Sequence, residues 1–171
     1  MANILTYCGT RQSDCLVSFL VVGAAELCQK IADGLHQCAK ERNWHISVHQ
    51  CELINQVLQS HSNLGIDFII LSFDWKIAQS VSEVETNISL IDQQYILSGA
   101  ACLVSCKGIS NCMGLTFHIS TKIQEKYNIK LLCANVYKPQ GCVQLGNRIL
   151  NIAESVLGMT NGIPTSALVI H

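Results

Sequence analysis

Continuous apolar runs alternate along this chain with stretches whose apolar residues recur at helical spacing, and this alternation constrains the fold more than any other feature. The runs read VSFLVVG from Val17, IDFIILSF from Ile66, AACLVSC from Ala100 and IKLLCAN from Ile129. A strand without polar alternation is typical of a sheet that is covered on both faces. Such strands separated by helices form parallel β-α-β units with right-handed crossovers. We therefore predict an α/β fold built on a three-layer, mostly parallel sheet.

The segments between these runs carry the signatures of helices. The predicted helices cover residues 24–43, 80–97, 115–128 and 142–158. The predicted helix over residues 80–97 opens on a capping box formed by Ser82 and Glu85, and the last helix ends at Gly158, a residue that commonly terminates helices. One apolar stripe follows the capping box at helical spacing: Val84, Ile88, Ile91 and Tyr95.

The length of 171 residues fits a single domain with one core. We expect that domain to cover residues 1–171, with residues 1–14 as an amino-terminal extension and residues 159–171 as a carboxyl-terminal tail. Charged residues make up only 13% of the chain, against about a quarter in soluble proteins, and the mean hydropathy is +0.30. No apolar run approaches the roughly 20 residues of a membrane helix. We expect a soluble domain that holds part of its surface against a partner.

Net charge and cysteine spacing exclude several kinds of site. A formal net charge of −1 offers no electrostatic footprint for DNA or RNA. Among the 10 cysteines there is no C-x-x-C pair, and the spacing of Cys102, Cys106 and Cys112 matches no common zinc pattern. The amino terminus also lacks the order of a secretion signal. We expect free thiols in a reducing compartment, cytosol or nucleus, and no metal.

The strand that begins at Val17 ends in Gly23, where a nucleotide-binding protein keeps its phosphate loop. In G-x-x-x-x-G-K-[ST], the second glycine lets backbone N–H groups wrap the phosphates, the lysine neutralises charge and the hydroxyl holds magnesium. Aligned from Gly23, these positions are Cys28, Gln29 and Lys30. They supply a side chain in place of bare backbone, an amide in place of a charge, and no magnesium ligand. We interpret Lys30 as a solvated lysine on an exposed helix face, because one residue is about 100° of helix rotation.

The other elements of a guanine-nucleotide site are altered as well. The D-x-x-G motif would follow a strand end at Asp74, but Ile77 stands where its glycine is required. The N-K-x-D motif that reads guanine corresponds to CKGI, in which Cys106 replaces the asparagine, Lys107 survives and Ile109 replaces the aspartate. No acceptor is left for the base. The sequence therefore predicts a fold that has lost its nucleotide chemistry.

Four stretches of the chain resemble the centromere protein M family. They read FLVVGAAELCQKIAD from Phe19, IDFIILSFD from Ile66, SVSEVETNISLIDQQYILSGAACLV from Ser80 and ILNIAESVLGMTNGIPTSALVI from Ile149. The resemblance covers most of the chain and keeps the order of the elements. It implies a small-GTPase-like fold without nucleotide-binding motifs, that is, a pseudo-GTPase with no cofactor and no catalytic activity.

The same resemblance implies a setting and partners. It indicates an adaptor subunit of the inner kinetochore, in the constitutive centromere-associated network at the centromere of chromosomes in the nucleus. The helical-repeat subunit centromere protein I would be its direct partner, in an assembly with centromere proteins H and K that supports chromosome segregation in mitosis. No small-molecule substrate, nucleic acid or membrane is expected. An atypical nucleotide-binding GTPase that uses Lys30 or Lys107, and a pseudo-GTPase adaptor of another family, remain alternatives.

Two apolar clusters are not explained by the predicted core and are candidates for partner binding. Ile96 and Leu97 lie outside the apolar stripe of their helix, and Leu168 belongs to a tail with no long element to support it. Exposed apolar clusters often mark interfaces. Local packing is the alternative for both: a helix end folded under itself, and a tail lying back on the domain.

Overall fold

The computed structural model describes residues 5–7, 16–60, 64–106 and 113–158. Its centre is a five-stranded, wholly parallel sheet in the order β3-β2-β5-β6-β7. The strands are β2 (Val17–Val22), β3 (Ile46–Cys51), β5 (Phe68–Phe73), β6 (Ala101–Ser105) and β7 (Lys130–Cys133). Numbered within the sheet, this is the 2-1-3-4-5 order of flavodoxin-like α/β folds.

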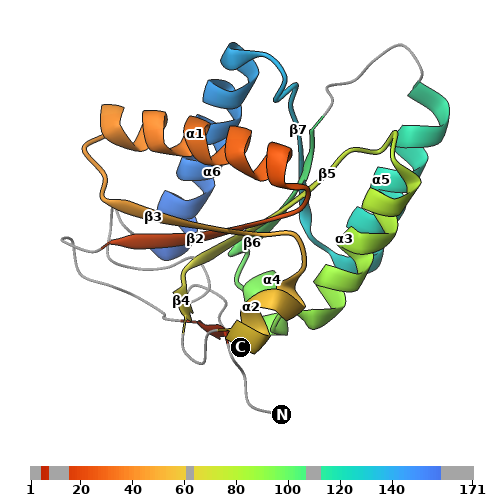
Figure 1. Cartoon of the computed structure of the whole chain (residues 1–171), viewed down its shortest axis with the longest axis horizontal. Helices are drawn as coiled ribbons and strands as arrows, with labels where there is room; N and C mark the ends of the chain where they lie inside the picture. The colour runs from red at the N-terminus through yellow and green to blue at the C-terminus, as the bar shows by residue number, and fades with distance from the viewer. Residues whose placement is uncertain (1–4, 8–15, 61–63, 107–112, 159–171) are drawn as a thin grey trace.

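Helices cover both faces of the sheet, as Figure 1 shows. One face carries α1 (Ala25–Glu41) and α6 (Pro139–Leu157), and the other carries α3 (Ala78–Leu90) and α5 (Met113–Tyr127). The two helices α1 and α6 cross so closely that a Cβ on Gly146 would lie 2.7 Å from the carbonyl oxygen of Gly34. The predicted α/β fold, with three layers and a parallel sheet, is confirmed.

Burial explains why the central strands read as continuous apolar runs. Every residue of β2, β5 and β6 is buried, because each of these strands has a helix layer above and below it. The predicted apolar stripe is buried as well, with Tyr95 fully enclosed and its hydroxyl donating to the carbonyl of Ile66 at 2.7 Å. Within the described residues, no helix is long and apolar enough to cross a bilayer.

The predicted helix over residues 80–97 is two helices, and its predicted capping box is wrong. Helix α3 already begins at Ala78, so Ser82 lies inside it and donates its hydroxyl hydrogen to the carbonyl of Gln79. The chain leaves α3 at Ile91, whose backbone is extended. A short helix, α4 (Gln93–Leu97), then starts with the Asp92 carboxylate accepting from a backbone N–H. Aspartate is a preferred N-cap residue, and Asp92 therefore favours the start of a new helix at this point.

Three short elements were not predicted. They are β1 (Leu5–Tyr7), β4 (Leu64–Ile66) and α2 (Ile54–Ser60). Strands β1 and β4 pair in parallel as a separate two-stranded sheet, so part of the predicted amino-terminal extension is a strand. Helix α2 is held to α3 by a buried hydrogen bond of 2.9 Å from the N–H of Ile54 to the Asn87 side chain.

Candidate functional site at the carboxyl ends of the strands

Open parallel sheets bind ligands beyond the carboxyl ends of their strands, at the point where the strand order reverses. Here that point lies between β2 and β5, because the chain passes from β2 to its neighbour β3 and then returns to β5 on the other side. Gly23 follows β2 and Asp74 follows β5. The degenerate phosphate loop therefore lies where a nucleotide would have to bind.

Only Gly23 and Ala24 separate the end of β2 from the start of α1. Gly23 turns the chain with a φ of 145°, and a Cβ at this position would collide with the hydroxyl of Ser72. The polar groups around the turn are already paired: the N–H of Gly23 donates to the carbonyl of Cys51, and the Ser72 hydroxyl donates to that of Val22. This turn is too short to wrap a phosphate group.

Cys28 lies in the first turns of α1 and fills the space beneath the turn. Its thiol sulfur is 3.3 Å from the carbonyl oxygen of Gly23 and 3.6 Å from that of Val21. Burial raises the pKa of the Cys28 thiol to about 11, so the thiol stays protonated and its single hydrogen can be donated to either oxygen. Carbonyl oxygens thus face the centre of the turn, where a phosphate-binding loop presents N–H groups.

The structure gives a different reason from the sequence why position 28 cannot contact a phosphate group. We predicted that the Cys28 side chain would stand between the backbone and the ligand. Instead Cys28 is helical, and its own N–H already donates to the carbonyl of Ala24 at 3.0 Å. A glycine here would leave the same backbone hydrogen bond in place.

Gln29 and Lys30 bind residues of the protein itself. The Gln29 amide donates to the Asp33 carboxylate at 2.8 Å, one helical turn further on. Lys30 Nζ lies 3.7 Å from the Glu26 carboxylate and 5.6 Å from the centre of the Tyr137 ring. Lys30 lies on the surface of α1, as we interpreted it, but its side chain is only 33% exposed and packs over an aromatic ring and does not extend fully into solvent.

The carboxylate of Asp74 holds neighbouring loops together. It is only 2% exposed, accepts from the backbone N–H of Lys76 at 3.0 Å and lies 3.5 Å from the hydroxyl of Tyr137. Burial and the nearby Asp74 charge raise the pKa of Tyr137, which keeps its hydroxyl protonated and able to donate. Sequence reasoning missed Tyr137, because it is 63 residues from Asp74 and no motif connects them.

The degenerate base motif is only partly described by the structure. Cys106 is fully buried, and its N–H donates to the carbonyl of Phe73 at 3.0 Å. Its thiol contacts the carbonyl of Val104, so it points inward and offers nothing to a base at the surface. Lys107 and Ile109 lie outside the described residues. Among the residues that are described, no cluster of three or more His, Cys, Asp or Glu side chains could hold a metal ion.

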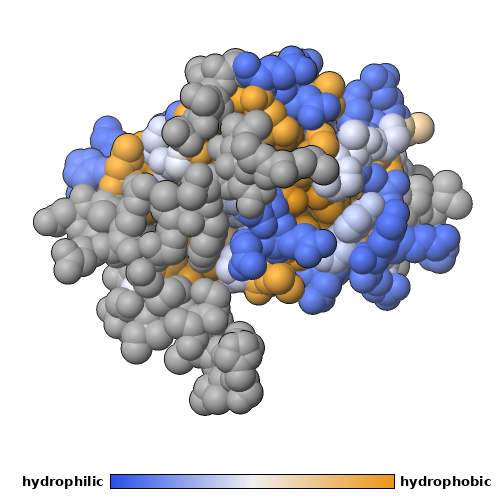
Figure 2. All heavy atoms as spheres, turned by 90° about the horizontal axis from the view of Figure 1, so that it is seen from below, coloured by the Kyte–Doolittle hydropathy of each residue, from blue (hydrophilic) through white to orange (hydrophobic). Residues whose placement is uncertain are grey.

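The candidate partner-binding residues differ in exposure. Leu97, at the end of α4, is 74% exposed, the largest value among the exposed large apolar side chains of the described residues. Ile96 is half-buried and packs against the core, so the structure favours local packing for it. Leu168 lies outside the described residues. Figure 2, which views the end of the molecule that carries α2 and α4, shows apolar side chains reaching the surface between polar ones.

The geometry of the site does not identify the protein family, but a comparison of the sequence with protein families does. The sequence profile of the family described as Centromere protein M (CENP-M) matches residues 13–171, nearly the whole chain. The chain belongs to the centromere protein M family. It is therefore a centromere and kinetochore protein, and the family membership predicted from the four similar stretches is confirmed. No match was found among curated proteins.

Solved structures give only distant similarities. One is the crystal structure of oxidised flavodoxin 2 from Bacillus cereus, with a TM-score of 0.48 and 13% identity, covering 82% of this chain and 99% of that one. Another is the crystal structure of the flavodiiron protein from Giardia intestinalis, with a TM-score of 0.41 and 11% identity, covering 83% of this chain and 38% of that one. Similarities this distant say nothing about ligands.

Proposed function

We propose that this centromere protein M family member is a non-catalytic pseudo-GTPase adaptor of the inner kinetochore. The observation that carries the proposal is the closed turn at the switch point. Two residues replace a phosphate loop, carbonyl oxygens line its centre, and Cys28 fills it. The side chains aligned with the lost lysine and hydroxyl, Gln29 and Lys30, are engaged by Asp33 and Glu26.

Loss of the phosphate-loop residues should reduce the free energy of nucleotide binding by more than any remaining contact could supply. Each charge-assisted hydrogen bond to a phosphate contributes about 1.5–3 kcal/mol. Loss of the lysine and magnesium contacts together, counted as two such bonds, therefore costs about 3–6 kcal/mol, roughly a hundredfold to ten-thousandfold in affinity. A nucleotide would also have to displace the Cys28 thiol from the turn. We expect the chain to bind no guanine or adenine nucleotide at cellular concentrations.

The partner we propose is centromere protein I, in an assembly with centromere proteins H and K that supports kinetochore assembly and chromosome segregation. The resemblance implies these proteins, and the surface of the domain suits an adaptor. With 13% charged residues the chain has few charges to spread over its surface. Leu97 projects from a helix of only five residues, an arrangement that fits an apolar anchor in a partner's groove.

Two measurements test the proposal. Calorimetry with GTP, GDP and ATP in the presence of magnesium should show no heat of binding, and a micromolar affinity for any of them would refute the pseudo-GTPase assignment. Co-purification with centromere proteins H, I and K should weaken at least about tenfold for Leu97→Glu, because an apolar anchor buried at an interface would become charged.

The matched control for the second measurement is Ile77→Glu. Ile77 is also exposed, at 53%, but it follows β5 at the opposite end of the strands from α4. Both variants should keep their melting temperature within about 2 °C, since a surface substitution away from core contacts changes little. Equal loss of the partner in both variants, or none in Leu97→Glu, would remove Leu97 from the interface.

A further inference from the structure

The five-stranded sheet has two edges, and they are protected very differently. Strand β7 is short, begins with the exposed Lys130, and its last carbonyl, that of Cys133, accepts a hydrogen bond from Arg148 at 3.3 Å. Strand β3 has six residues, ISVHQC, without a lysine, proline or carboxylate. Proteins usually protect an edge strand with one of these residues, because an open edge pairs with other chains. Among the described residues β3 pairs with β2 alone.

The register of the sheet shows which backbone groups of β3 face outward. The carbonyls of His45 and Cys51 accept from N–H groups of Val17 and Gly23, so odd-numbered residues of β3 bond to β2. In a parallel ladder the pattern repeats at every second residue. The N–H and C=O groups of Ile46, Val48 and Gln50 therefore point away from the sheet, as a row of donors and acceptors about 7 Å apart. A row of this kind can pair with another strand.

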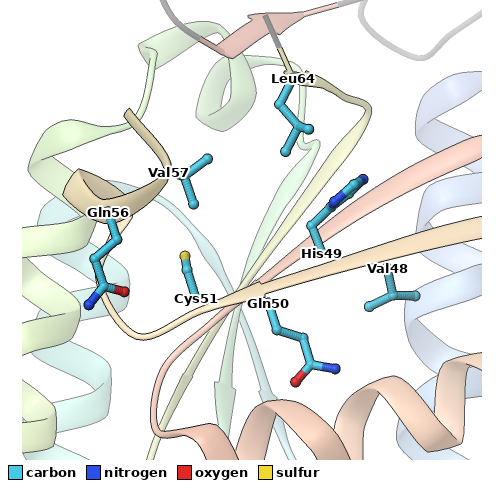
Figure 3. A pocket seen from close by; sticks show the side chains of 7 residues that line it. All are labelled: Val48, His49, Gln50, Cys51, Gln56, Val57 and Leu64. Carbon is cyan, nitrogen blue, oxygen red and sulfur yellow. The ribbon is translucent and has the colours of Figure 1, made fainter. Parts of the chain in front are cut away.

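A neutral hollow lies beside the second half of β3, on the face that carries α2 and β4. It measures about 440 Å³, and Figure 3 shows His49 and Cys51 pointing from β3 toward Val57 and Leu64 on its far side. None of the described residues that line it carries a formal charge. Burial raises the pKa of the Cys51 thiol to about 12, so this hollow keeps a neutral floor. It fits small or β-branched side chains of an added strand.

A second hollow, of about 470 Å³, lies at the start of β3 on the α1 side. Its lining includes His36, Lys40, Trp44, His45 and Ile46, and none of the described residues that line it is acidic. Lys40 forms no ion pair with any described residue. The two hollows together present a neutral surface on one side of β3 and a basic one at its beginning.

We propose that β3 binds an extended segment of a partner protein by strand addition. The segment is uncharged where it passes Val48 and Gln50, and it carries one Asp or Glu side chain that enters the basic hollow beside Lys40. Main-chain hydrogen bonds to Ile46, Val48 and Gln50 supply affinity, and alternate side chains enter the two hollows and supply specificity. This surface is three strands away from the strand that α4 precedes, so it can be occupied together with an interface at Leu97.

The probe for this proposal is a pair of labelled peptides, Asp-Thr-Val-Thr-Val-Thr-Val and its reversed sequence, which cover both strand directions. Fluorescence anisotropy with the full chain should show saturable binding of one of them. The same peptide with Lys in place of Asp should bind at least about tenfold more weakly, because the basic hollow repels it. A version methylated on alternate backbone nitrogens should not bind, because it cannot pair with the edge.

The decisive variant is Gln50→Pro, with Gln50→Ala as its control. The N–H of Gln50 points outward, so proline removes no bond within the sheet and is tolerated at such an edge position. We expect Gln50→Pro to reduce peptide affinity at least about tenfold while Gln50→Ala changes it less than about threefold. Equal affinity for both variants would overturn the proposal.

Hydrogen exchange identifies any other occupant of the edge. The amides of Ile46, Val48 and Gln50 should exchange rapidly in the free chain and slowly with the bound peptide. Protection already present in the free, monomeric chain would mean that its own residues cover β3. Dimerisation lost in Gln50→Pro would mean that a second copy does. Either result, or the absence of binding by both peptides, overturns the proposal.

Discussion

Replacing three adjacent residues would complete the phosphate-loop sequence motif in this chain. The substitutions are Cys28→Gly, Gln29→Lys and Lys30→Ser, which together with Gly23 give G-x-x-x-x-G-K-S. If side-chain chemistry were the only loss, this variant would recover the lysine and hydroxyl contacts of a nucleotide site. We expect no recovery, because helix α1 begins at Ala25 and all three positions are helical. The missing feature is a loop, and substitution does not lengthen the chain.

The structure also sets the expected loss of stability in this triple variant. Glycine within a helix costs about 1 kcal/mol, and removal of the buried Cys28 side chain costs about 1–2 kcal/mol more. The Lys30 contacts with Glu26 and Tyr137 are partly exposed and add at most about 1 kcal/mol. A total near 3 kcal/mol lowers the melting temperature of a domain of this size by about 6–12 °C.

Calorimetry with GTP and magnesium, together with thermal melts, measures both expectations on the same samples. The control is Gln29→Lys alone, which keeps Cys28 in place and should melt like the parent chain. Micromolar binding of GTP by the triple variant, or stabilisation of its fold by GTP, would show that the turn opens into a loop. Our reasoning about the closed switch point would then be wrong.

Two further predictions concern the core. Gly146→Ala should lower the free energy of unfolding by about 1–3 kcal/mol in urea titrations, because its Cβ would press on the backbone of Gly34. As a control, Asn151→Ala at an exposed position of the same helix should change this free energy by less than about 0.5 kcal/mol. An unchanged free energy of unfolding in Gly146→Ala would contradict the close crossing of α1 and α6. The thiols of Cys28 and Cys51 have pKa values raised from 9.0 to about 11 and about 12, so the unfolded chain loses these protons first and stability should fall as the pH rises above about 9. Replacing both by Ala should make that decline shallower but not remove it, because burial also raises the pKa of the Cys102 and Cys106 thiols. An unchanged pH dependence would show that the Cys28 and Cys51 thiols are solvated.

The parts of the fold that could be predicted are those where one physical requirement dominates. Strands such as β5, buried on both faces, need continuous apolar sequence, and that pattern is unambiguous. The start of α1 was predicted to within one residue, because Gly23 ends the apolar run of β2, although Ala24 supplies no side-chain cap. The pair Ser82 and Glu85 did match a capping signature, but tertiary packing extends α3 past it toward β5. Local sequence patterns thus predicted which helices and strands form more accurately than they predicted the residues at which these elements begin and end.

The candidate site was predictable in what it had lost and unpredictable in what replaced it. Missing motif residues can be read directly from sequence, as at Cys106 and Gln29. The contacts that now occupy the site join residues far apart in the chain, such as Asp74 with Tyr137, and sequence spacing cannot place them together. The edge of β3 became recognisable only when the strand order was known.

The contacts of Tyr137 join the segments that follow three strands of the sheet. Its ring meets Lys30 after β2, its hydroxyl meets Asp74 after β5, and the residue itself follows β7. In a nucleotide-driven switch these segments would move relative to one another; here each restrains the others. Such a domain meets its partners as a rigid body and loses little conformational entropy on docking. Under the proposed adaptor function, we expect the timing of its assembly to depend on the supply of subunits and not on turnover of a bound ligand.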